Sequence, residues 1–124
     1  MNISSPSGKK SLLVNLHFRG IIAPNGDEVM LIDFHTHAFP EKIAPRALEK
    51  LHYDAGGLKP QTEGTVQSLK AEMATDGVDL SVVLSIATNA HQQKSVNDFA
   101  AAMSERAEII AFGSVYPDSE DALE

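Results

Sequence analysis

The sequence contains no cysteine. Disulfide bonds and thiolate metal sites are therefore excluded, and any bound metal ion must be held by histidine, aspartate or glutamate side chains. The lack of cysteine is compatible with a reducing compartment, and we expect a cytoplasmic protein. No apolar run approaches the roughly 20 residues of a membrane span. A membrane is therefore not among the partners that we expect.

Basic residues are also scarce. The 124 residues include 10 Lys and Arg against 17 Asp and Glu, which gives a formal net charge of −7. A surface that binds phosphates usually needs a basic stripe, and the sequence shows none, so nucleic acid is not expected as a partner. Hydrophobic residues make up 43% of the chain and charged residues 22%. These values are near the average for globular proteins and predict one domain with a packed core.

Residues 1–29 differ in composition from the rest of the chain. They carry three basic and two acidic side chains, so the acidic surplus belongs to residues 30–124. The apolar stretch at residues 12–14 is too short for a signal peptide, which needs about 7–15 apolar residues. Pro24-Asn25-Gly26-Asp27 is typical of a turn. We expect residues 1–29 to form a disordered or weakly structured extension.

A second hypothesis for this extension is that the start has been assigned wrongly and that translation begins at Met30. Gly26-Asp27-Glu28 stands just upstream of that methionine. A purine-rich ribosome-binding sequence would encode these three residues if it were read in frame. The intact mass of the natively expressed protein distinguishes the two starts.

After Met30 the sequence alternates between strand-like and helix-like segments. Thr65 can cap one of the helices, and Gly77 fits the left-handed position after its last turn. The strands are nearly continuous apolar runs, which predicts that they are buried on both faces, as in parallel sheets. This order predicts an α/β fold of parallel βα units. The expected strands are residues 30–35, 80–86 and 108–115, and the expected helices are residues 42–52, 65–75 and 91–104, with a further helix starting at about residue 120.

Three βα units are less than half of an eight-unit barrel, whose usual size is about 250 residues. The last predicted helix has room for about one turn, which returns little stability for its nucleation cost. We therefore expect the chain to be the N-terminal part of a larger domain.

The residues with the clearest chemistry are Asp33, His35 and His37, which close the first predicted strand. Side chains alternate along a strand, so these three are expected on one face. Two imidazoles at a strand end can aim at one point, and imidazole nitrogen is a good ligand for zinc and neighbouring divalent metals. We therefore predict that His35 and His37 are metal ligands.

Asp33 has two interpretations. Its carboxylate could orient a histidine that binds the metal, or it could accept a hydrogen bond from a neighbouring backbone group at the strand end. The sequence leaves both open. His17, His52 and His91 are expected at the surface.

The chain resembles the amidohydrolase superfamily over the first strand, where residues 31–37 read LIDFHTH and are followed by Phe39-Pro40. It is most similar to the amidohydrolase-related group that includes aminocarboxymuconate-semialdehyde decarboxylase-like enzymes. Residues 82–88 and 112–118 resemble the second and third strands of that group. The resemblance covers about residues 30–124. It implies a metal-dependent (β/α)8 TIM barrel, of which this chain would hold about the first three βα units.

The resemblance also implies a function. His35 and His37 carry over as metal ligands, whereas the family's other ligands, histidines after middle strands and an aspartate after the last, are not in this sequence. Tyr116 stands where family members often have histidine, so no role is transferred to it. We expect zinc, with manganese or another divalent ion as alternatives. The implied activity is hydrolysis of a small carboxylate or cyclic amide.

The alternatives are a decarboxylase of the same family or a non-catalytic fragment that acts as an interaction module. An incomplete barrel leaves open strand edges, which favour association into a homo-oligomer. Two ligands are fewer than the three or four that zinc sites use. We therefore expect the chain to be inactive alone.

Overall fold

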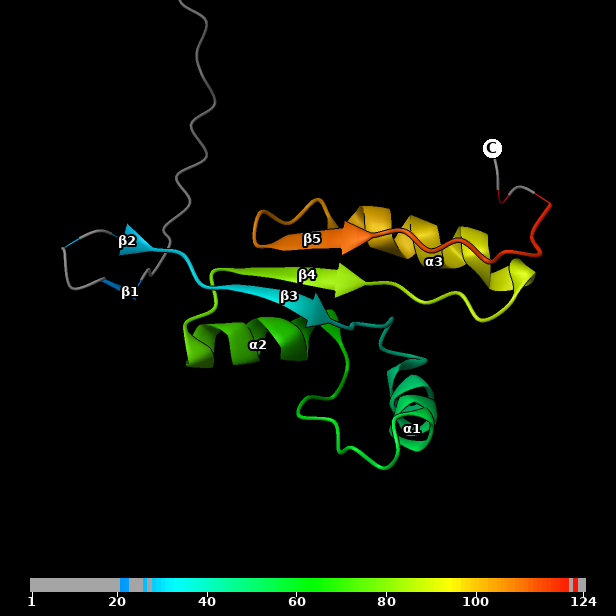
Figure 1. Cartoon of the computed structure of the whole chain (residues 1–124), viewed down its shortest axis with the longest axis horizontal. Helices are drawn as coiled ribbons and strands as arrows, with labels where there is room; N and C mark the ends of the chain where they lie inside the picture. The colour runs from blue at the N-terminus through cyan, green and yellow to red at the C-terminus, as the bar shows by residue number, and fades with distance from the viewer. Residues whose placement is uncertain (1–20, 23–25, 27, 121, 123–124) are drawn as a thin grey trace, which may run out of the picture.

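The computed structural model describes residues 21–22, 26, 28–120 and 122, and its main body is a parallel three-stranded sheet with three helices (Figure 1). The strand order is β3-β4-β5, and both pairs are parallel. The predicted α/β class and parallel pairing are confirmed. None of the described helices is long and apolar enough to cross a membrane. The elements are β3 (Ile32–Thr36), α1 (Ala44–Asp54), α2 (Val66–Asp76), β4 (Leu80–Leu84), α3 (Ala90–Met103) and β5 (Ile109–Phe112).

Part of the predicted extension forms a short antiparallel pair. Strand β1 (Ile21–Ile22) pairs with β2 (Glu28–Val29). Between them, Gly26 has a φ of +86°, which a turn requires and glycine adopts without strain. Residues 1–20, 23–25 and 27 lie outside the described part of the chain, and with them most of the predicted turn. The start at Met30 stays a prediction.

The ends of α2 follow their local sequence. The hydroxyl of Thr65 accepts from the backbone N–H of Ser68 at 3.1 Å, and the hydroxyl of Ser68 accepts from the N–H of Thr65 at 3.0 Å. This reciprocal capping satisfies two N–H groups that the helix start leaves unpaired. Gly77 ends the helix with a φ of +72°. Both predicted helix ends are confirmed.

Helix α3 explains why β5 is shorter than predicted. The N–H of Ser114 donates to the side chain of Asn97 at 2.7 Å, and the N–H of Tyr116 donates to the side chain of Gln93 at 2.7 Å. Because these backbone groups bond to α3, the strand ends at Phe112 and not at about residue 115. The residues at 117–118 form a turn. Of the helix predicted from about residue 120, residues 121 and 123–124 lie outside the description.

Helices α2 and α3 cover one face of the sheet, and the core lies between that face and the two helices. The buried cluster joins residues from both helices to Val83 of β4 and Ile109 of β5. Met103 is 1% exposed and is the largest of the fully buried side chains. The members of the cluster are Ala38, Leu69, Met73, Val83, Ala100, Met103 and Ile109.

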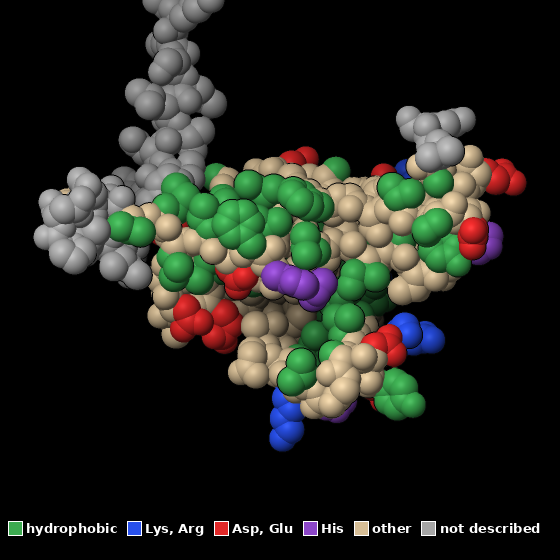
Figure 2. Space-filling model, viewed as in Figure 1, with side chains coloured by type: hydrophobic (Ala, Val, Ile, Leu, Met, Phe, Trp, Pro, Cys, Tyr) green, Lys and Arg blue, Asp and Glu red, His purple; other side chains and the backbone are tan. Residues whose placement is uncertain are grey.

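The other face of the sheet carries exposed apolar side chains. Phe34 is 70% exposed, Ile110 43% and Phe112 56%. Figure 2 shows hydrophobic side chains gathered over the sheet. The register pairs Val82 with Ile110 and Leu84 with Phe112, so these four share the face. We call Phe34, Val82, Leu84, Ile110 and Phe112 the open face.

The prediction that all three strands are buried on both faces is wrong for β3 and β5, because their side chains on the open face are exposed. In β3 the residues Phe34 and His35 are exposed, and in β5 only Ile109 is buried. The central strand β4 is buried at its three middle positions, as predicted. The described helices cover one side of the sheet, so the outer strands keep exposed apolar side chains on the other side, whereas Val82 of the central strand is 4% exposed.

A salt bridge between α2 and the start of β5 is expected to make stability depend on pH. Lys70 Nζ lies 2.6 Å from Glu108 Oε1, and the hydrogen bond from Lys70 holds the pKa of Glu108 below its ordinary value. A lowered folded-state pKa stabilises the fold above the unfolded pKa, and this contribution is lost as pH falls through the folded pKa. Glu108→Gln should therefore cost about 0.2–1 kcal/mol at neutral pH, because the pair is partly exposed.

The cost of Glu108→Gln should be smaller at an acidic pH, as the lowered pKa of Glu108 is approached, than at neutral pH. Urea unfolding at both pH values measures it. Asp98→Asn, which removes the more exposed pair with Lys94, is the matched control and should cost less. An equal cost of Glu108→Gln at both pH values would contradict the assignment.

Candidate metal centre

A β-bulge in β3 sets the directions of the candidate residues. Asp33 pairs with Ser81, and Thr36 pairs with Val83, so β3 advances by three residues where β4 advances by two. The extra residue interrupts the alternation of side chains. Asp33 and Thr36 therefore both lie on the face that the helices cover. The prediction that Asp33 shares a face with both histidines is wrong for this reason.

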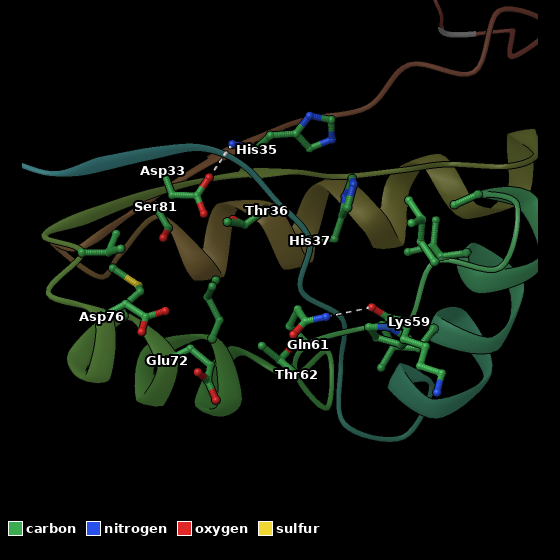
Figure 3. Close-up of a pocket in the computed structure, with 18 of the residues that line it drawn as sticks. Asp33, His35, Thr36, His37, Lys59, Gln61, Thr62, Glu72, Asp76 and Ser81 are labelled. Carbon is green, nitrogen blue, oxygen red and sulfur yellow. Dashed lines mark hydrogen bonds between the residues drawn. The ribbon is translucent and has the colours of Figure 1, made fainter.

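His35 and His37 lie together on the opposite side of the strand from Asp33 (Figure 3). Their ring centres are 5.1 Å apart, and the ring planes make an angle of 78°. Two imidazoles that bind one tetrahedral zinc ion, with Zn–N distances of about 2.0–2.1 Å, have ring centres about 5 Å apart. The spacing of the two rings therefore fits a single shared ion.

The ring of His37 is held by strand β4. Its Nδ1 lies 2.8 Å from the carbonyl oxygen of Leu84. A carbonyl can only accept, so Nδ1 carries the hydrogen, and Nε2 keeps its lone pair for a metal. Histidines that bind metals are commonly fixed in this way, with the other ring nitrogen donating to a backbone carbonyl. The ring of His37 is thus held in one orientation by β4, with Nε2 left as the nitrogen that could bind a metal ion.

Asp33 contacts the backbone of His35. Its Oδ1 accepts from the N–H of His35 at 3.0 Å, drawn in Figure 3 as the dashed line between these two residues. This is the second of the two interpretations that the sequence left open, the bond to a neighbouring backbone group. The carboxylate therefore stabilises the backbone of the bulge at His35.

A cavity of about 470 Å³ lies beside the histidines, and both of them line it. It is bounded by β3, by α2, and by α1 with the loop that follows it (Figure 3). Sites for small molecules typically measure about 300–1,000 Å³. The cavity is therefore large enough for a small organic molecule. Its polar lining includes Asp33, Thr36, Lys59, Gln61, Thr62, Glu72, Asp76 and Ser81.

The described residues do not complete a metal centre. Among them, no group of three or more His, Asp or Glu side chains could hold a metal ion. His52 Nδ1 lies 2.7 Å from the carbonyl oxygen of Leu58, and His91 is exposed in α3. His17 lies outside the described part of the chain. A catalytic zinc site uses three protein ligands and an open position, so the pair alone does not complete one.

Comparison with family models, curated proteins and solved structures gives no match. The resemblance to the amidohydrolase superfamily therefore rests on the residues quoted above and stays a prediction. What the chain can do is inferred below from the paired imidazoles, the anchor of His37 on β4 and the adjoining cavity.

Proposed function

We propose that this chain is the N-terminal part of a divalent-metal-dependent hydrolase of the amidohydrolase type, in which His35 and His37 are two of the metal ligands. The observation that supports this most directly is the imidazole pair. The ring centres are 5.1 Å apart, and His37 donates to Leu84. The spacing of the two rings and the orientation of His37 both suit one shared ion.

Three features support a barrel of which these are about the first three βα units. The sheet is parallel, and β3 and β5 each have one strand neighbour in it. Its open face is apolar, like the inward face of a barrel, which layers of side chains fill. The two histidines stand at the C-terminal end of β3, and enzymes with this barrel place their active sites at that end of the strands.

A bound zinc ion would polarise a substrate carbonyl and make a bound water nucleophilic. The chain's own contribution is to hold the ion through two imidazoles beside a cavity of about 470 Å³. The substrate class, a small carboxylate or cyclic amide, comes from the resemblance, and the cavity volume suits a molecule of that size. With two ligands, the chain alone should bind metal weakly and show no turnover.

Calorimetric titration with zinc tests the proposal. The wild-type chain should give a saturable binding heat, and the double variant His35→Ala/His37→Ala should give none, because it lacks both imidazoles. The double variant His52→Ala/His91→Ala is the matched control and should bind as the wild type does. Equal binding by wild type and His35→Ala/His37→Ala would overturn the proposal.

A further inference from the structure

The bulge in β3 determines which face of the sheet the two histidines occupy. In a regular strand that continued from the pairing of Asp33 with β4, His35 would lie opposite Val83. His35 and His37 would then lie beside Asp33, on the face that the helices cover. In the structure Thr36 pairs with Val83 instead, and both histidines lie on the opposite side of the strand (Figure 3).

The side chain of Thr36 bonds to β4 in this bulged register. Thr36 stands between the two histidines in sequence and is half-buried on the face that the helices cover. Its hydroxyl donates to the carbonyl oxygen of Val82 in β4 at 3.0 Å. In the regular register, residue 36 would move one position along β4 and onto the other face, which breaks this bond. The bond therefore favours the bulged register over the regular one.

The ring of His35 depends on the backbone of the bulge more than the ring of His37 does. His37 has its own anchor, because its Nδ1 donates to the carbonyl of Leu84 at 2.8 Å. For His35, the described part of the chain supplies a hydrogen bond to the backbone N–H, from Asp33 at 3.0 Å, and none to the ring. The direction of the His35 ring therefore follows from the backbone between Asp33 and Thr36.

We propose that Thr36 is a positioning residue, whose hydroxyl bond to β4 holds the register that directs His35 and His37 away from the helices. This inference rests on the proposed role of the two histidines as metal ligands. A chain that also populates the regular register binds metal more weakly, in proportion to the fraction that stays bulged. Thr36 thus contributes to metal affinity without touching the ion.

Zinc calorimetry of Thr36→Val tests the inference, because valine keeps the branched shape of threonine and lacks the hydroxyl. The dissociation constant for zinc should rise roughly 2–10-fold, which corresponds to the net contribution of one hydrogen bond. Thr36→Ser keeps a hydroxyl at the same position and should restore the wild-type affinity. A merely structural role of Thr36 would lower the stability of the variant and leave the zinc affinity of the folded chain unchanged.

Thr75→Val is the matched control. The hydroxyl of Thr75 donates to the carbonyl of Ala71 within α2, also at 3.0 Å, so this variant loses the same kind of bond away from the histidines. Its zinc affinity should equal that of the wild type. Circular dichroism at the temperature of the titration checks that each variant is folded, so that unfolding does not enter the measured affinity.

The possible failures separate this inference from the proposed function. Wild-type affinity in Thr36→Val would overturn the role of Thr36 and leave the histidine pair as metal ligands. No rescue by Thr36→Ser, or an equal loss of affinity in Thr75→Val, would also overturn that role, because the effect would not come from the hydroxyl at position 36. Zinc binding that is absent from the wild type, or unchanged in His35→Ala/His37→Ala, would overturn both the inference and the proposed function.

Discussion

His37→Ala should weaken zinc binding and also destabilise the fold. The imidazole is one of two ligands, so its loss should exceed the 10–100-fold, in order of magnitude, that removal of a ligand's hydrogen-bonding partner costs. The variant also leaves the Leu84 carbonyl without the bond at 2.8 Å. Loss of that bond should cost about 0.5–1.5 kcal/mol. Zinc calorimetry and urea unfolding measure the two effects separately.

His35→Ala is the matched control that separates the effect on zinc binding from the effect on stability. Its ring is exposed, so its removal should weaken zinc binding while leaving the free energy of unfolding nearly unchanged. Unchanged stability of His37→Ala would contradict the anchoring of its ring on β4. Unchanged zinc affinity in either variant would contradict the shared ion.

Met103→Ala should be the most destabilising of the substitutions considered. Met103 is 1% exposed and packs in the cluster between the sheet, α2 and α3. Truncation of a buried methionine leaves a cavity and costs about 2–5 kcal/mol. Domains are stable by only about 5–15 kcal/mol, so the variant should lose a large part of its resistance to urea.

Met30→Ala provides the comparison, because Met30 is 44% exposed. It should change stability by less than about 0.5 kcal/mol, as exposed substitutions usually do. Similar small losses in both variants would contradict the position of the core between the helices and the sheet.

The helix boundaries could be predicted because their signals are local. Thr65 caps α2 through a residue three positions away, and Gly77 ends it through its own backbone angle. Pro45 stands in the first turn of α1, where its missing N–H costs nothing. In each case, the physical cause lies within one turn of the residue that signals it.

The geometry of the site depends on contacts that are distant in sequence. The anchor of His37 is Leu84, 47 residues later. The bulge that turns Asp33 away from the histidines is a mismatch in register with Ser81 and Val83. The sequence predicts that two histidines follow a strand, but not which strand orients them.

The exposure of β3 and β5 could not be predicted for a related reason. An apolar run such as that of β5 reads the same whether or not a second layer covers it. Burial of Phe112 depends on what packs against the open face, and the residues of the strand do not encode that partner.

The most direct test of the histidine pair is nuclear magnetic resonance of the ring nitrogens in ¹⁵N-labelled protein, recorded with and without zinc. The chain has five histidines, so each ring reports on its own site. Zinc should shift a ring nitrogen of His35 and the Nε2 of His37, while the Nδ1 of His37 stays protonated and the other three rings are unchanged. Zinc-induced shifts confined to His17, His52 or His91, or absent from all five rings, would contradict the assignment of His35 and His37 as metal ligands.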